Sequence, residues 1–247
     1  DSLIPYPLDE VSLDFEKLDI NESDPSKVNV LLSAARSESI EARVAALDLA
    51  GFQAKVIDVE SYAVSRAYDL ILPQLPDDAK DKTVAIVDVG AVMTLFSVTD
   101  SGAHIYSRDQ LFGGEQYTRS IVSYYNQTFE EAEQAKTAHD LPPNYTFEVL
   151  GPFHTIFSQQ IRRAIQMFLT SSGKDKVDYL VISGGSANVE GLETLLTEEL
   201  GIHTIVANPF KSMSIAEGID QEVLDKTAPQ YMVAAGLALR SFVPWHL

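Results

Sequence analysis

The chain has 247 residues, and its 18 Lys and Arg residues against 36 Asp and Glu residues leave a formal net charge of −18. This acidity argues against a nucleic-acid partner, because neutralising phosphates requires clustered Lys and Arg side chains. The sequence contains no cysteine, which excludes disulfide scaffolds, cysteine-ligated zinc and thiol catalysis and favours a reducing, cytoplasmic setting. No apolar run approaches the roughly 20 residues that a transmembrane helix needs.

The first part of the chain predicts a small α/β unit followed by one strand–helix step. The expected elements are strand 10–20, strand 28–35, helix 37–51, strand 54–60 and helix 62–75. Gly51 is expected to end the first helix, and the hydroxyl of Ser37 or Ser39 to cap its start. The charged, proline-marked segment 75–82 then indicates a boundary.

The remaining residues predict a second α/β region that begins with an antiparallel meander. Its expected elements are strands 83–90, 92–100 and 102–112, helices 113–126, 129–141 and 148–172, strand 177–185, helix 189–201, strand 202–209 and helix 229–242. Gly173 is expected to close the longest helix. The helical aromatic residues are expected in the core, among them Tyr124, Tyr125, Phe153, Phe157 and Phe168.

The sequence Asp88-Val89-Gly90 stands at the end of an apolar strand, inside a predicted hairpin. A glycine there lets a phosphate approach the backbone, and the aspartate could hold a hydrated Mg²⁺ ion. The alternative is that Asp-x-Gly only forms a turn, for which these residue types are well suited.

Two more glycine pairs stand where an element begins. Gly113-Gly114 precedes a predicted helix, whose exposed N–H groups could bind an anion. Gly184-Gly185-Ser186 follows a buried strand. Each pair could equally be a plain connection in an α/β sheet. Neither has the spacing of a dinucleotide-binding fingerprint or of a P-loop.

Glu133 and Lys136 share one face of a polar helix and could contact sugar hydroxyls or an adenine edge. The alternative is a solvated salt bridge. Ser171 and Lys174 have the spacing found in serine acyl-enzymes, but their place at a helix end predicts a polar cap. The five histidines show no metal-ligand spacing.

The order of these features resembles the second half of the actin-like and sugar-kinase ATPase fold. The strings IPYPLDEVSLDF, AIVDVGAVMTLFSV, FGGEQYT and VISGGSANVEGL are similar to the PilM family of type IV pilus assembly proteins, relatives of FtsA. The resemblance covers about Ile4 to Phe242. It implies an α/β, actin-like (ribonuclease H-like) two-domain fold with an FtsA-like 1C subdomain.

The resemblance also implies a nucleotide site with ATP and Mg²⁺ as cofactors. Asp88 would hold Mg²⁺ through water, and Glu60 would face the attacking water. The cofactor-binding residues would be Asp88, Gly90, Gly113, Gly114, Glu133, Lys136, Gly184, Gly185 and Ser186. The family's first phosphate loop, of the form D-I-G-S, has no counterpart in this sequence. We therefore expect that the chain is an N-terminally truncated part of a longer protein. The longer protein would bind ATP and Mg²⁺, whereas this chain would bind ATP poorly or not at all.

The implied subdomains are 1–54 (1C-like), 55–80 (part of 1A), 81–127 (first part of 2A), 128–176 (2B-like and helical), 177–228 (second part of 2A and 2B) and 229–247 (a C-terminal helix returning to 1A, plus a tail). The tail Val243–Leu247 carries a Pro-Trp pair resembling that of PilN tails. We expect it either to be a frayed end or to dock on a neighbouring copy.

The function implied by the resemblance is that of a cytoplasmic adaptor, peripheral to the inner membrane through its partners. It would bind the N-terminal tail of PilN in a groove between subdomains 1A and 1C. Other inner-membrane and motor proteins of the pilus would be further partners. Whether the chain also forms a homodimer stays open. Two alternatives stay open: an active ATPase or carbohydrate kinase in which Asp88 and Glu60 handle Mg²⁺ and water, and an FtsA-like polymerising membrane tether.

Overall fold

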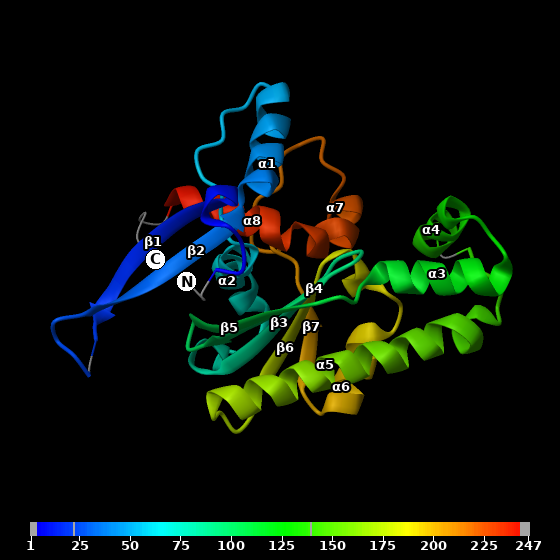
Figure 1. Cartoon of the computed structure of the whole chain (residues 1–247). Helices are drawn as coiled ribbons and strands as arrows, with labels where there is room; N and C mark the ends of the chain where they lie inside the picture. Colours follow the sequence, from blue (N-terminus) through cyan, green and yellow to red (C-terminus); the bar gives the residue numbers. More distant parts are fainter. Residues whose placement is uncertain (1–3, 22, 139, 243–247) are drawn as a thin grey trace. The chain divides into compact units, whose positions relative to one another are not determined.

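The computed structural model describes residues 4–21, 23–138 and 140–242. Their contacts separate into two compact units, and Figure 1 traces the elements of each. Unit 1 comprises the described residues up to Val59 together with Phe242, and unit 2 runs from Glu60 to Ser241. The tail 243–247, with the docking role considered for it, lies outside the described residues, as do His139 and His246.

Unit 1 is built on an antiparallel hairpin of strands β1 (Val11–Ile20) and β2 (Val28–Arg36), as predicted. In its register Phe15 lies opposite Leu32. Side chains alternate between the two faces of a strand, so one face of the hairpin carries Leu13, Phe15, Val30 and Leu32. These four side chains are 43–64% exposed, and we refer to them as the hairpin face.

Helix α1 (Ser37–Leu49) follows β2 directly, and Gly51 stops it with a φ of +80°. The predicted serine cap is wrong: Arg36 is the N-cap residue and makes no side-chain bond there. The Ser37 hydroxyl instead lies 3.1 Å from the hydroxyl of Ser12. The helix buries none of its residues.

The predicted strand at 54–60 is also wrong, because residues 52–59 form no regular element and Glu60 is the first residue of helix α2 (Glu60–Ile71). Apolar alternation is a local signal, whereas a strand needs a neighbour to accept and donate its backbone hydrogen bonds. Neither sheet of the described chain includes this segment.

Unit 2 contains a five-stranded sheet in the order β5-β4-β3-β6-β7. The strands are β3 (Thr83–Val89), β4 (Thr94–Asp100), β5 (Ala103–Gln110), β6 (Tyr179–Ser183) and β7 (His203–Val206). The first three form the predicted antiparallel meander, while β6 runs parallel to β3 and β7 parallel to β6. Strand β3 therefore lies at the centre, with a neighbour on each side.

The other helices of unit 2 are α3 (Gly114–Tyr125), α4 (Phe129–Ala138), α5 (Gly151–Ser172), α6 (Leu192–Leu200), α7 (Gln221–Thr227) and α8 (Met232–Leu239). A π-helical turn (Thr146–Leu150) precedes α5, and Gly173 closes α5 with a φ of +69°. Short 3-10 turns flank α8 where one longer helix was predicted. The sequence did not lead us to expect α7.

Helices cover both faces of this sheet (Figure 1). Alternate residues of β3 belong to different cores: Ala85, Val87 and Val89 pack with α3, α5 and α6, whereas Val84 and Ile86 pack with α2 and α8. Unit 2 is thus a three-layer α/β structure, which is the predicted fold class.

Most of the aromatic residues predicted for the core are buried. Phe153, Phe157 and Phe168 are at most 4% exposed, and Tyr125 packs against the same core. Tyr124 is 47% exposed, because its position on α3 turns it away from the sheet. The prediction is therefore wrong for Tyr124.

Helices α2 and α8 cross so closely that their backbones touch. A Cβ atom on Gly236 would lie 1.8 Å from the carbonyl oxygen of Ala63. The Gly236 carbonyl accepts a hydrogen bond of 3.2 Å from Nε of Arg66. No residue larger than glycine fits at this crossing without a shift of one helix.

Candidate functional site

Three chain segments meet at the carboxyl end of β3. The N–H of Gly114 donates to the carbonyl of Gly90 (3.0 Å), and the N–H of Glu115 donates to the carbonyl of Ala91 (2.7 Å). A Cβ atom on Gly113 would lie 2.4 Å from the Ala91 oxygen, and one on Gly114 would lie 2.3 Å from Oγ of Ser186. The glycine pair therefore lets α3 begin directly against the β3–β4 turn.

The third segment is the turn after β6. Gly184 has a φ of +85°, and a Cβ atom there would lie 2.4 Å from the carbonyl oxygen of Val89. Its N–H donates to the carbonyl of Pro229 at 2.8 Å. Gly185, by contrast, has nothing within 4 Å of such an atom. Gly184 thus serves close backbone contact, while Gly185 faces open space.

The first N–H groups of α3 are not exposed, and this corrects the reason for predicting an anion site at Gly113-Gly114. The N–H groups of Gly114, Glu115 and Gln116 already donate to the carbonyls of Gly90, Ala91 and Gly113. Sequence spacing locates a helix start but does not reveal that a neighbouring turn uses its donors.

A cavity of about 1120 Å³ lies beside these glycines, wholly within unit 2. Its volume is slightly larger than the roughly 300–1,000 Å³ typical of small-molecule sites. Of the predicted site residues, its lining includes Gly90, Gly114, Glu133, Lys136, Gly185 and Ser186. Gly113, Gly184, Asp88 and Glu60 are not part of the lining.

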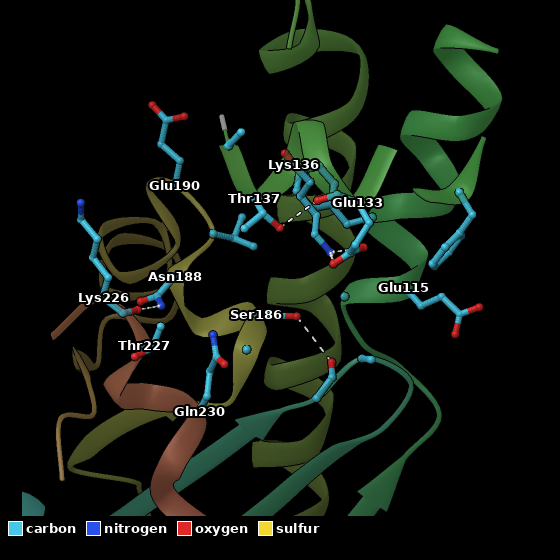
Figure 2. A pocket seen from close by; sticks show the side chains of 18 of the residues that line it. Glu115, Glu133, Lys136, Thr137, Ser186, Asn188, Glu190, Lys226, Thr227 and Gln230 are labelled. Atoms are coloured by element: carbon cyan, nitrogen blue, oxygen red, sulfur yellow. Dashed lines mark hydrogen bonds and ion pairs between the residues drawn. The ribbon is translucent and has the colours of Figure 1, made fainter. Parts of the chain in front are cut away.

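Glu133 and Lys136 form one wall of the cavity (Figure 2). Thr118, which lies outside the lining, holds both side chains in place. Nζ of Lys136 donates to Oγ1 of Thr118 at 2.9 Å and lies 2.7 Å from Oε1 of Glu133. The Thr118 hydroxyl in turn donates to Oε2 of Glu133 at 2.6 Å. Partial burial would raise the pKa of Glu133, but the bonds from Lys136 and Thr118 outweigh it, and the pKa is lowered. The pair is therefore formed and faces the cavity.

Asp88 lies at the end of β3 with its carboxylate directed at the neighbouring strand. Its Oδ2 accepts a hydrogen bond of 2.7 Å from the Ser183 hydroxyl. Burial raises the pKa of Asp88 to about 6; the Ser183 bond opposes this shift and the charge of Glu60 adds to it. Glu60 itself is exposed at the start of α2. A buried acid with a raised pKa is a frequent mark of a functional site.

Another wall of the cavity comes from α7 and the turn after it, which sequence reasoning missed. Lys226, Thr227 and Gln230 line it, and the carbonyl of Lys226 accepts a hydrogen bond from the Asn188 side chain. The available signal was Asp220, which caps α7 by accepting from the N–H groups of residues 222 and 223. An aspartate followed by polar helix formers is such a start signal.

Aromatic side chains complete the lining. Tyr117, Phe129 and Tyr145 contribute to it, and Tyr117 stacks on Phe153 with ring centroids 4.9 Å apart. The Tyr145 hydroxyl donates to Glu190, and this bond raises the pKa of Tyr145 to about 12. The cavity is therefore bounded by flat apolar surfaces as well as by polar groups.

Other sequence candidates are structural. The Ser171 hydroxyl donates to the carbonyl of Phe168 in the last turn of α5, as the predicted polar cap would, whereas Lys174 pairs with Asp100 of β4 at 2.7 Å. In the described part of the chain no group of three or more His, Asp or Glu residues could hold a metal ion. None of the helices described is both long and apolar enough to cross a membrane.

A family model described as type IV pilus assembly protein PilM matches residues 1–242. The chain belongs to the PilM family. Its fold is similar to a solved structure titled "PilM-PilN type IV pilus biogenesis complex", with 27% identity and a TM-score of 0.80 over 98% of this chain and 69% of that chain.

Two more distant structures show the same fold. One is the ethanolamine utilization protein EutJ from Carboxydothermus hydrogenoformans, with 18% identity and a TM-score of 0.59 over 83% of this chain and 62% of that chain. The other is MreB 5 of Spiroplasma citri bound to AMPPNP, with 14% identity and a TM-score of 0.52 over 83% of this chain and 64% of that chain. The chain thus spans less than two thirds of the length of these two proteins. The predicted actin-like fold is confirmed.

Proposed function

We propose that this chain, an actin-like protein of type IV pilus assembly, acts as an adaptor that binds an adenine nucleotide in unit 2 and the N-terminal peptide of PilN through unit 1. The cavity beside the Gly90, Gly114 and Gly185 backbone carries the first part of the proposal. The six predicted site residues that line this cavity come from segments far apart in the sequence. A structure of the related fold is titled as bound to AMPPNP and another as bound to ADP.

The residues present fit a nucleotide with Mg²⁺. Glu133 and Lys136 would hydrogen-bond the sugar hydroxyls, and the glycines would admit the rest of the ligand. Mg²⁺ keeps several of its waters and is bound by one or two carboxylates. Asp88 lies outside the cavity lining, so it would hold the ion only through water. The ion would supply charge neutralisation for the phosphates. Asp88 must be ionised for this role, and because its pKa in the metal-free chain is raised to about 6, the affinity for Mg²⁺ should fall as pH falls through that value.

Calorimetric titration with an adenine nucleotide tests the first part of the proposal, with two variants of Gly185. Gly185→Phe is expected to fill the cavity and abolish binding, because open space lies beside this residue. Gly185→Ala leaves the cavity open and should bind the nucleotide as well as the chain without a substitution, called the parent chain below. A parent chain that binds no adenine nucleotide, or a Phe variant that binds as well as the parent, would refute the proposal.

The second part rests on family membership, on the likeness to a PilM–PilN complex, and on the hairpin face of unit 1. Four apolar side chains of this face are 43–64% exposed. Exposed apolar groups of this kind often mark protein-binding surfaces, and a hairpin edge can also pair with an extended peptide. Binding to PilN would place the chain at the inner membrane.

Fluorescence anisotropy with a synthetic N-terminal PilN peptide tests this contact. Phe15→Ser is expected to weaken binding, whereas Asp14→Ser, which changes the opposite face of β1, serves as the matched control. Binding that is absent in the parent chain would refute PilN as the partner. Binding that is equal in the Phe15 variant and the parent would exclude the hairpin face.

We also propose that unit 1 corresponds to the 1C-like subdomain and that the sheet of unit 2 corresponds to subdomain 2A. On this assignment α4 and α5 belong to the 2B-like region, and α2 and α8 to the part of 1A present in the chain. Limited proteolysis tests the border between the 1C-like subdomain and the rest of the chain. The protease should cleave between residues 50 and 60 and leave unit 2 intact.

A further inference from the structure

We infer that Thr118 is a positioning residue for the proposed nucleotide site, although it lies outside the cavity lining. Its hydroxyl fixes the orientation in which the Glu133 carboxylate and the Lys136 ammonium meet the sugar of the ligand. This inference rests on the proposed nucleotide binding and adds to it a residue of α3 that does not touch the ligand. Three observations carry it: the burial of Thr118, the closed arrangement of the three polar groups, and the weak anchoring of α4.

Thr118 is placed by the glycine junction. It stands four residues after Gly114 on α3, and its Oγ1 lies 3.1 Å from the Gly114 carbonyl oxygen. The start of α3 is itself fixed, because the N–H of Gly114 donates to the carbonyl of Gly90. Thr118 is fully buried. A buried hydroxyl makes its hydrogen bonds within the protein, so its partners are set by the fold and not by solvent.

The Thr118 hydroxyl, the Glu133 carboxylate and the Lys136 ammonium form a closed triangle. Oγ1 of Thr118 lies 2.6 Å from Oε2 of Glu133 and 2.9 Å from Nζ of Lys136. The third side, from Nζ of Lys136 to Oε2 of Glu133, is 2.8 Å. A hydroxyl carries one proton, and the nearer, charged acceptor is Glu133 rather than the Gly114 carbonyl. Neither charged group can rotate without breaking a contact of the triangle.

Helix α4 has few apolar contacts that would fix its orientation. Among its ten residues the buried one is Ala132, whereas Phe129 is 44% exposed. The pair of Glu133 and Lys136, which Figure 2 shows turned toward each other, lies within α4 and by itself fixes nothing relative to α3. The bonds to Thr118 therefore join the two helices at the point where the polar wall faces the cavity.

A wall that is set in advance favours binding, because side chains that are already ordered lose less freedom when the ligand arrives. A sugar diol can accept from the Lys136 ammonium and donate to the Glu133 carboxylate while both keep their places. The Thr118 hydroxyl should therefore contribute to the affinity for nucleotides that carry sugar hydroxyls and not to the affinity for nucleotides that lack them.

Calorimetric titration with ATP and with 2′,3′-dideoxy-ATP, each with Mg²⁺, tests this difference in the parent chain and in Thr118→Val, which keeps the shape and loses the hydroxyl. The Val variant should bind ATP at least about tenfold more weakly, because a hydrogen bond to a charged group is lost. It should bind dideoxy-ATP within about twofold of the parent chain. An equal loss for both ligands, or no loss for ATP, would overturn the inference and leave the proposed nucleotide binding intact. If the parent chain binds neither ligand, the proposed function fails as well.

Two matched variants separate the hydroxyl of Thr118 from general effects on α3. Thr118→Ser keeps a hydroxyl and should bind ATP within about threefold of the parent chain. Ser120→Ala removes an exposed hydroxyl of the same helix, which donates to the carbonyl of Gln116 at 3.0 Å, and it should leave the affinity unchanged. A Ser variant that binds ATP as weakly as the Val variant would contradict a role for the hydroxyl.

A carboxyl NMR titration of the chain without nucleotide tests the positioning by itself. Partial burial raises the pKa of Glu133, but the bonds from Lys136 and Thr118 outweigh it. Thr118→Val should therefore raise the pKa of Glu133, whereas Thr118→Ser should leave it low. An unchanged pKa of Glu133 in the Val variant would overturn the inference, whatever the affinities for the two nucleotides.

Discussion

Replacing Asp88 by asparagine is expected to change the stability of unit 2 in a way that depends on pH. Burial raises the pKa of this carboxyl from 3.8 to about 6 in the folded state. The folded chain therefore binds more protons than the unfolded chain between these two values, and stability falls as pH rises through that window. Above pH 6 both states are ionised, and the folded state carries the full cost of a buried charge.

The size of this cost follows from the two pKa values. At 1.36 kcal/mol for each pKa unit, the rise from 3.8 to about 6 corresponds to about 3 kcal/mol. Asparagine is neutral and nearly isosteric, and its amide oxygen can still accept from Ser183. We therefore expect Asp88→Asn to be more stable than the parent by up to about 3 kcal/mol near pH 8 and by well under 1 kcal/mol near pH 4.

Urea unfolding followed by circular dichroism at several pH values measures this difference. Asp178→Asn is the control, because its effect on stability should have the opposite sign. Partial burial would raise the pKa of Asp178, but the bonds from Lys176 and from the N–H of Thr83 lower it overall. Asp178→Asn should therefore reduce stability at neutral pH and lose this effect as pH falls. If Asp88→Asn reduces stability equally near pH 5 and pH 8, burial does not set the proton affinity of Asp88.

Three further substitutions test the packing and the cavity wall. Gly236→Ala should lower the unfolding free energy measured in urea by at least about 2 kcal/mol, because it forces α8 away from α2. The control Gly185→Ala should change the unfolding free energy by no more than about 0.5 kcal/mol. Equal effects of the two substitutions would contradict the crossing geometry. Phe157→Ala should cost about 3–5 kcal/mol in the same assay, and a cost below about 1 kcal/mol would show that this core is loosely packed. Lys136→Met should raise the pKa of Glu133 in a carboxyl NMR titration, and an unchanged pKa would mean that the pair is not formed.

The elements predicted best are those whose signal is local and whose partners follow immediately in the chain. Apolar runs separated by turn residues were enough to place β3, β4 and β5 as a meander, and Gly173 was enough to end α5. The fold class then followed from strands alternating with helices. The resemblance to a family added the actin-like assignment, which periodicity alone does not give.

Two of the errors arose where distant residues decide the outcome, and one where a local signal was overlooked. The segment 54–60 alternates like a strand but has no neighbour in either sheet. Gly113-Gly114 begins a helix, as predicted, but the carbonyls of the β3–β4 turn occupy its donors. The wall formed by α7 was missed because its cap residue stands in a long polar segment. For the first two errors the missing information was a long-range contact, which one sequence does not contain, whereas α7 carried a local start signal in Asp220 that was overlooked.

The crossing of α2 and α8 has a consequence for how unit 2 is made during translation. These helices are the first and the last of the unit, and the bond from Arg66 to Gly236 joins residues 170 positions apart. Val84 and Ile86 pack in the core to which both helices contribute. During synthesis this face of the sheet therefore stays partly uncovered until the final helix has left the ribosome. Such late closure slows folding and leaves apolar surface open to aggregation or to a chaperone.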